Sequence, residues 1–150
     1  MTEACAHDGR MRAPGQLVEA FRASGLKVTP QRRLLFDLLH DDTGHPTAEA
    51  LFNRASDQMP GISLRTVYQT LNDLTAMGEI QQVSFGSGPA HFDPNVADHH
   101  HAVCSVCGAI HDVYVDGATQ LAIEGAPDFR SESLTIVFHG SCARCSGPDT

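Results

Sequence analysis

Hydrophobic residues recur at helical spacing in successive stretches of the first half of the chain. The first stretch covers about residues 16–23. The second begins at Thr29 and Pro30, residue types preferred for a helix N-cap and for the first helical position. The third begins at Thr47, which is again of an N-cap type. The pattern therefore predicts three consecutive amphipathic helices, each with one face suited to a shared core.

A fourth helix is predicted from Ser63 to Met77, and Gly78 is placed to end it as a glycine just past the last turn. The residues of its apolar face are Val67, Leu71 and Leu74. Two short strands, residues 79–85 and 90–93, are predicted on either side of a Gly-Ser-Gly turn. Helices followed by a small hairpin are typical of a winged helix-turn-helix.

The helix from Ser63 to Met77 would be the recognition helix of such a domain. It presents, away from its apolar face, side chains of types that reach phosphates and base edges. These are Arg65, Thr66, Tyr68, Gln69 and Asn72. The alternative is an ordinary small helical domain with a polar surface.

The length and composition are typical of a folded chain with a hydrophobic core. It has 150 residues, which is room for one ordinary domain or two very small ones, and 41% of them are hydrophobic. We find neither a signal-peptide pattern nor an apolar stretch of membrane-spanning length. We therefore expect a cytoplasmic protein without a membrane partner, in which paired cysteines more often bind metal than form disulfides. Residues 1–15 are expected to be a flexible tail.

The formal net charge of −8, taken alone, argues against a nucleic-acid ligand. The charge is distributed unevenly, however. Residues 10–36 contain six Lys and Arg residues and one Glu, a net charge of +5, whereas residues 89–150 contain two Arg and eight Asp and Glu residues, a net charge of −6. The basic segment is either a solvated helix face or a surface that contacts phosphates.

Two CxxC pairs lie in the second half of the chain, and their members are Cys104 with Cys107 and Cys142 with Cys145. Each pair can place two thiolates on one ion, so the two pairs together complete a tetrahedral site. Because no ligand position remains open, the sequence predicts a structural zinc site that staples a strand–helix–strand unit. The alternative, a redox-active CxxC, requires one pair only and a thiol of low pKa. Cys5 is expected to be a free thiol.

A histidine-rich segment precedes the first cysteine pair. In an extended segment His99 and His101 point to the same face, and Asp93 and Asp112 are within reach of that face. Imidazoles combined with carboxylates, without thiolates, suit Fe(II) or Mn(II) and also admit Zn(II), Ni(II) or Co(II). His45, near the start of the third helix, is the best candidate for a ligand from the first domain. A metal bound by His45 and by the ligands of the second domain would link the two domains mechanically. The alternative is a set of surface histidines.

Taken together, these motifs resemble the ferric uptake regulator family of dimeric, metal-dependent bacterial repressors. The resemblance covers roughly Leu17 to Cys145. Its motifs are Gly-Leu-Lys-Val-Thr-Pro-Gln-Arg (25–32), His-Pro-Thr-Ala-Glu (45–49), Ser-Leu-Arg-Thr-Val-Tyr-Gln-Thr-Leu (63–71), Asp-His-His-His (98–101) and both CxxC pairs. It implies an α+β fold with an N-terminal winged-helix DNA-binding domain (16–88), a hinge near residues 86–92, and a C-terminal α/β dimerisation domain (89–150) carrying the four-cysteine zinc site.

Within the family, the regulatory ligands resemble those of the peroxide-responsive branch. That branch uses a histidine of the His-Pro-Thr motif, a hinge aspartate, the His-x-His pair and a later aspartate. The corresponding residues are His45, Asp93, His99, His101 and Asp112. The resemblance implies that peroxide oxidises His45 or His99 when the metal is Fe(II). Iron-uptake members more often have Glu at the two carboxylate positions, and their further metal site needs a His where this chain has Ser141.

The resemblance predicts a homodimeric repressor that binds operator double-stranded DNA, with structural Zn(II) and regulatory Fe(II) or Mn(II), and that controls oxidative-stress genes of the catalase type. The expected DNA contacts are Arg22, Lys27, Arg32, Arg65, Thr66, Tyr68 and Gln69. An iron-responsive repressor of uptake genes is the alternative. A zinc-dependent hydrolase or thiol oxidoreductase is a distant one, because the cysteines leave no open position and neither an HExxH helix nor a Ser-His-Asp order occurs. We do not expect an enzyme.

Overall fold

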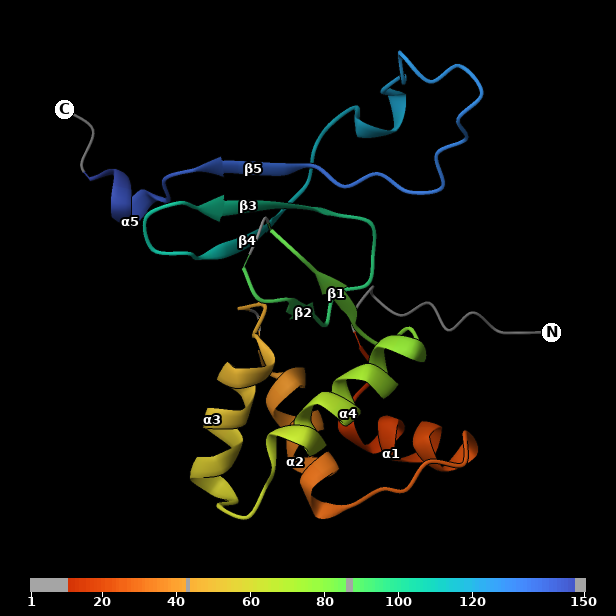
Figure 1. Cartoon of the computed structure of the whole chain (residues 1–150), viewed down its shortest axis with the longest axis vertical. Helices are drawn as coiled ribbons and strands as arrows, with labels where there is room; N and C mark the ends of the chain where they lie inside the picture. Colours follow the sequence, from red (N-terminus) through yellow and green to blue (C-terminus); the bar gives the residue numbers. More distant parts are fainter. Residues whose placement is uncertain (1–10, 43, 86–87, 148–150) are drawn as a thin grey trace. The chain divides into compact units, whose positions relative to one another are not determined.

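The computed structural model describes residues 11–42, 44–85 and 88–147. The chain divides into two compact units, residues 1–97 and residues 98–150 (Figure 1). The expected functional division into residues 16–88 and 89–150 stays a prediction. Cys5 and most of the expected tail lie outside the described residues.

The first unit contains the expected helices and hairpin. Its helices are α1 (Pro14–Ala23), α2 (Pro30–His40), α3 (Ala48–Gln58) and α4 (Leu64–Ala76). Strands β1 (Gln81–Val83) and β2 (His91–Asp93) pair antiparallel as a two-stranded wing. The winged helix-turn-helix prediction is confirmed.

Side-chain caps determine where three of these helices begin. The Thr29 and Thr47 hydroxyls accept hydrogen bonds from the backbone N–H groups of Arg32 and Ala50, at the starts of α2 and α3. Ser63 caps α4 in the same way. Gly78, which follows α4, has a φ of +76°, a conformation that residues with a Cβ rarely adopt. The residues that the sequence indicates as helix starts therefore act as caps.

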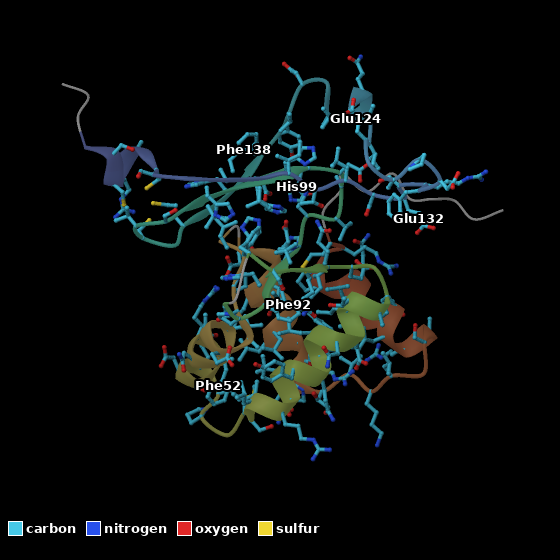
Figure 2. All side chains as sticks on the ribbon, turned by 45° about the horizontal axis from the view of Figure 1, so that its top comes forward. Phe52, Phe92, His99, Glu124, Glu132 and Phe138 are labelled. Carbon is cyan, nitrogen blue, oxygen red and sulfur yellow. The ribbon has the colours of Figure 1, made fainter. Side chains whose placement is uncertain are left out.

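The apolar faces of the four helices form one core. Phe21 of α1 meets Phe36 of α2 edge to face, with ring centroids 4.8 Å apart. Phe92 of β2 is buried and belongs to the same core, so the wing is packed onto the helices of its unit (Figure 2). The other fully buried apolar residues of the helices are Leu17, Leu35, Leu39, Leu51, Ala55, Val67, Leu71 and Leu74.

The segment just before α1 differs from the tail expected for residues 1–15. Met11 is buried, and its backbone N–H donates to the carbonyl of Pro94 at 2.8 Å. The Arg12 guanidinium forms an ion pair with the buried carboxylate of Glu79. Residues 11–15 are therefore part of the folded unit, because one apolar and one charged side chain find partners near the wing.

The second unit is built on a three-stranded sheet. Its strands are β3 (His100–Cys104), β4 (Ile110–Val113) and β5 (Val137–Gly140), in the order β4-β3-β5. Strand β3 pairs antiparallel with β4 and parallel with β5, and the short helix α5 (Ala143–Ser146) follows β5. With the helical first unit, this sheet confirms the α+β fold class.

The connection between β4 and β5 corrects the strand–helix–strand expectation. It contains only the three-residue 3₁₀ helix η1 (Ala118–Gln120), and residues 121–136 have no regular secondary structure. Gly117 and Gly125 both adopt positive φ, and Pro127 follows, so the segment is made of turns. Its side chains are largely exposed, and Glu124 and Glu132 extend away from the sheet of their own unit (Figure 2).

Arg32 joins helices α2 and α4. Its guanidinium forms an ion pair with the Asp73 carboxylate at 2.8 Å and lies over the Phe21 ring, 5.2 Å from the ring centroid. The Arg32 side chain is only 15% exposed. The expected contact of Arg32 with DNA stays a prediction, and in this structure its charge is paired with Asp73 within the unit.

Replacing Asp73 with Asn is expected to lower the free energy of unfolding by about 1–2 kcal/mol, because the mostly buried guanidinium of Arg32 loses its counter-charge. Urea unfolding followed by circular dichroism measures the change. Asp57→Asn is the matched control, since Asp57 is exposed on α3. An equal effect of the two substitutions would contradict a structural role for the ion pair.

Candidate metal centres and nucleic-acid interface

The four cysteines of the CxxC pairs meet at one end of the sheet in the second unit. Cys104 ends β3 and is register-paired with Gly140 of β5, so the turns that follow these parallel strands lie at the same edge. The sulfur atoms of all four cysteines lie within 4.8 Å of one another. Figure 2 shows sulfur atoms gathered beside α5.

The cluster has hydrogen-bond donors that suit a thiolate. The backbone N–H groups of Cys107 and Cys142 donate to the Cys104 sulfur at 3.5 Å and 3.3 Å. These bonds lower the pKa of the Cys104 thiol to about 5. Hydrogen bonds with the sulfurs of Cys142 and Cys107 raise the pKa of Cys145 to about 12. The site thus favours a thiolate at Cys104 and a protonated thiol at Cys145, whose proton a bound cation would displace.

The spacing of the sulfurs fits a tetrahedral ion. Ligands at a Zn–S distance of about 2.3 Å are separated from one another by about 3.8 Å. The Cys107 and Cys142 sulfurs are 3.8 Å apart. Four ligands complete a tetrahedron, so the geometry suits a structural ion rather than a catalytic one.

A second constellation in the same unit contains two histidines and a carboxylate. His101 of β3 is register-paired with Asp112 of β4, and its Nε2 lies 3.6 Å from Asp112 Oδ1. His99 Nε2 lies 3.1 Å from the same oxygen, and the two imidazole rings have centroids 4.6 Å apart. The side chains of His99 and His101 are buried. Strand alternation therefore brings together the two imidazoles that the sequence places on one face.

A matching pair lies in the first unit. His45 Nε2 is 3.2 Å from Asp93 Oδ2, and both side chains are 2% exposed. His45 precedes α3 rather than beginning it, and it has a φ of +56°, which is found at no other non-glycine residue among those described. A non-glycine residue in this region is held there by its surroundings.

Strand β2 supplies those surroundings. The Nδ1–H of His91 donates to the carbonyl of His45 at 2.8 Å, and the backbone N–H of Phe92 donates to the carbonyl of Pro46 at 2.9 Å. Thr47 forms an isolated antiparallel bridge with His91. The His-Pro-Thr segment is thus bound to the strand that ends in Asp93, and His91 is a positioning residue that sequence reasoning left without a role.

The side chains of the candidate DNA-facing residues differ in their exposure and in the partners that they already contact. Arg65, Tyr68 and Gln69 are exposed on one side of α4, and Lys27 is exposed before α2. Thr66 is half-buried and bonded to Ser63. The exposed Arg22 lies 3.4 Å from the Glu19 carboxylate. The structure thus brings Arg65, Thr66, Tyr68 and Gln69 together on α4, while Arg32 lies in helix packing.

Sequence reasoning did not single out Glu49. It lies in the first turn of α3, and its Oε1 accepts a hydrogen bond from the Tyr68 hydroxyl of α4 at 2.8 Å. This bond lowers the pKa of Glu49 and raises the pKa of Tyr68. The only available signal was that Glu49 belongs to the His-Pro-Thr-Ala-Glu motif.

Within the parts of the chain that the structure describes, none of the helices has the length and apolar character needed to cross a bilayer.

Comparison with known proteins gives a consistent result. A sequence model of the ferric uptake regulator family matches residues 23–139. The peroxide operon regulator of Bacillus subtilis (strain 168) is 29% identical over 134 residues, which are 87% of this chain and 92% of that protein. The ferric uptake regulation protein of the same organism is 32% identical over 142 residues, which are 90% of this chain and 95% of that protein.

The solved structures agree on the fold. The ferric uptake regulator of Helicobacter pylori, described as having three functional metal binding sites, superposes with a TM-score of 0.75. The superposition covers 94% of this chain and 99% of that chain at 18% sequence identity.

The raised pKa of Tyr68 gives a direct test of its contact with Glu49. The chain has two tyrosines and no tryptophan, so in a Tyr114→Phe background the ultraviolet tyrosinate absorbance reports Tyr68 alone. Adding Glu49→Ala is expected to move the midpoint of this titration to lower pH, because the carboxylate that stabilises the protonated phenol is lost. Asp57→Asn in the same background should leave the midpoint in place. An unchanged midpoint with Glu49→Ala would show that the hydrogen bond does not form in solution.

Proposed function

The chain belongs to the ferric uptake regulator family, and we propose that it is a metal-dependent repressor that releases its operator when peroxide oxidises the metal site. The family is one of metal-responsive transcription regulators. The hydrolase and thiol oxidoreductase alternatives are therefore excluded.

The four cysteines hold structural Zn(II) in this proposal. The sulfur spacing of 3.8 Å and the two backbone donors to Cys104 support the assignment. Zinc bonded to both CxxC turns fixes the end of β3 against the end of β5. Because the connection between β4 and β5 contributes little regular structure, this staple carries much of the stability of the second unit.

The regulatory ligands are the five predicted residues His45, Asp93, His99, His101 and Asp112. Each unit contributes a buried imidazole close to a carboxylate, at distances of 3.1 Å and 3.2 Å. Adjacent ligands of an octahedral ion with bonds of about 2.1 Å are about 3 Å apart, so each pair has the spacing of two ligands on one ion. Asp93 and His99 are six residues apart, which limits their separation to about 20 Å whatever the arrangement of the units. The segment between Asp93 and His99 is thus a short tether between the two units. One Fe(II) or Mn(II) bound by the ligands of both units would fix this tether in one conformation.

That closure is what couples metal to DNA in the proposal. Without metal the tether allows many arrangements of the DNA-binding unit, and the binding-competent one is a fraction of them. DNA affinity is reduced by that fraction, and a metal that binds the closed state better restores it. Cytoplasmic location and control of catalase-type genes are part of the same proposal.

The repressor acts as a homodimer, in which a second copy covers part of the second unit. Strands β4 and β5 are both edges of the sheet, with unpaired backbone groups on their outer sides. The second unit also exposes large apolar side chains that a partner would bury. They include Tyr114, Leu121, Ile123, Phe129, Leu134 and Phe138. A two-fold dimer would present two recognition helices to successive half-sites.

Contacts with the operator are assigned to Arg22, Lys27, Arg65, Thr66, Tyr68 and Gln69. The assignments on α4 are supported by its exposed face, on which the side chains of Arg65, Tyr68 and Gln69 are exposed. Arg32 is the seventh proposed contact, and its pairing with Asp73 also orients α4 against α2.

The observation that carries peroxide sensing is the donor set itself. Buried imidazoles lie next to aspartates, with no thiolate among them. When bound, Fe(II) would promote cleavage of the O–O bond of peroxide beside the rings of His45 and His99, so that one oxygen atom is added to an imidazole, the other leaves as water, and the imidazole is the net two-electron donor. An imidazole that gains oxygen is a poorer ligand, so the closed state loses its metal.

Iron-responsive repression is the second candidate. It is favoured by the 32% identity to the ferric uptake regulation protein of Bacillus subtilis, slightly above the 29% to the peroxide operon regulator. It differs in outcome, because repression would follow iron reversibly and without oxidation of a ligand.

The two candidates are separated by comparing metals. Zinc-containing protein is loaded anaerobically with Fe(II) or with Mn(II) and treated with peroxide, and operator binding and peptide masses are then measured. We expect the Fe(II) form alone to lose binding and to gain one oxygen atom on the peptide of His45 or His99. If DNA binding by both forms resisted peroxide equally, the peroxide-sensing hypothesis would be overturned and iron-responsive repression would be the remaining candidate.

Replacing His45 with Ala is expected to abolish the metal dependence of DNA binding while leaving the zinc content and the dimer unchanged. Gel-shift titration with Mn(II), metal analysis and analytical ultracentrifugation measure the three properties. His40→Ala is the matched control, because His40 is an exposed histidine at the end of α2. Normal Mn(II)-dependent binding by the His45 variant would contradict the proposed tether.

A further inference from the structure

Glu49 occupies an unusual place for an acidic residue in a domain proposed to bind DNA. It lies at the start of α3, and it contacts Tyr68 on the exposed face of α4. The nucleic-acid backbone is anionic, so a carboxylate beside a recognition helix weakens phosphate binding. A negative charge does suit the first turn of a helix. That preference explains an acidic residue in this turn, but it does not explain the contact with a tyrosine that is proposed to contact the operator.

The direction of the hydrogen bond decides what the pair offers to a ligand. An ionised carboxylate only accepts, so the hydroxyl hydrogen of Tyr68 lies on the Glu49 side. The phenolic oxygen then has only lone pairs left to offer, and so does the second carboxylate oxygen. The pKa of Glu49 is lowered and that of Tyr68 is raised, so this state persists over a wide range around neutral pH. The pair is therefore a surface of acceptors alone.

Such a surface of acceptors can distinguish between the base edges in the major groove. Adenine presents an amino donor at N6 and cytosine one at N4, whereas guanine presents acceptors and thymine an acceptor and a methyl group. Phosphate oxygens are acceptors too. An acceptor-only pair is thus complementary to amino-bearing bases and is repelled by the remaining groups.

We propose that Glu49 is a specificity-determining residue, which together with Tyr68 forms an acceptor pair that selects adenine or cytosine at one position of each operator half-site. The inference rests on the proposed DNA-binding function and deepens it. Glu49 holds the Tyr68 hydroxyl so that the tyrosine cannot donate to a phosphate or to thymine O4. The acidic charge thereby lowers general affinity for DNA and increases discrimination between bases.

The test is selection from a random double-stranded DNA library by the full chain loaded with Zn(II) and Mn(II). Wild type is compared with Glu49→Gln, Tyr68→Phe and, as the matched loss of one exposed charge on α3, Asp57→Asn. The Gln side chain keeps an oxygen that accepts from Tyr68 but adds an amino donor. At one position the preference for adenine or cytosine should fall by about tenfold in Glu49→Gln and Tyr68→Phe, with thymine and guanine gaining in Glu49→Gln. Asp57→Asn should keep the wild-type preference.

Modified operators give a second measurement. Replacing the selected adenine with purine, or the selected cytosine with 2-pyrimidinone, removes only the amino group. Wild type should lose about tenfold in affinity, and the Glu49→Ala Tyr68→Phe variant should lose little further. Circular dichroism melting of each variant shows whether the first unit is intact.

The possible failures are distinguishable. If Glu49→Gln selects the same bases as wild type at every position, Glu49 has only a structural role and the inference is overturned. If wild type itself selects no sequence in the presence of Mn(II), both this inference and the proposed function fail.

Discussion

Backbone pairing at β2 is the constraint on which the candidate chemistry depends. This three-residue strand pairs with β1, and it binds the His-Pro-Thr segment through His91 and Phe92. Its alternation buries Phe92 in the helical core and leaves Asp93 beside His45. His45 is held at a positive φ that few side chains tolerate, so the imidazole is positioned before any metal arrives. If His45 binds metal as proposed, a side chain fixed in this way would lose little conformational entropy on binding.

Strand β3 links the two candidate metal centres of the second unit. His101 and Cys104 lie three residues apart on this strand, a separation of about 10 Å. The register that aligns His101 with Asp112 is the same one that places Cys104 at the cysteine cluster. A slip of one residue would turn every side chain of β3 to the other face. Zinc bound at the cysteines would therefore secure the register on which the candidate histidine site depends, which would give the structural metal a part in the proposed sensing.

The sequence was informative where local rules govern and uninformative where distant partners decide. Thr29, Thr47 and Ser63 cap their helices because an N-cap is a local interaction, and strand alternation was enough to pair His99 with His101. Spacing alone could not show that Arg32 would pair with Asp73, forty-one residues away, instead of remaining on the surface. The same is true of the Tyr68–Glu49 bond and of the order at residues 11–15.

The helix expected between the cysteine pairs was a different kind of error. It came from assuming that a long connection carries a helix, although positive-φ glycines and a proline divide residues 117–127 into turns. The apolar residues that such a helix would have buried are consequently exposed, and the proposal of a second copy rests on them.

The charge of the first unit explains why such a protein would need both a dimer and a metal. Of the six cations that give residues 10–36 their net charge of +5, Arg12 and Arg32 are paired with carboxylates inside the unit. Arg22 lies close to Glu19. Arg10 lies outside the described residues, so among those described Lys27 and Arg33 are left from this segment, with Arg65 on α4, and Glu49 adds an opposing charge nearby. Each released counterion strengthens binding, so a single unit with so few available cations would hold DNA weakly and with little dependence on salt. Two units fixed together would double the contacts at little further entropic cost, and in the proposed function that joint fixation is what the regulatory metal controls. Weak single-site binding is therefore the condition that makes metal gating effective: a unit that bound tightly alone would remain on DNA after the metal was lost.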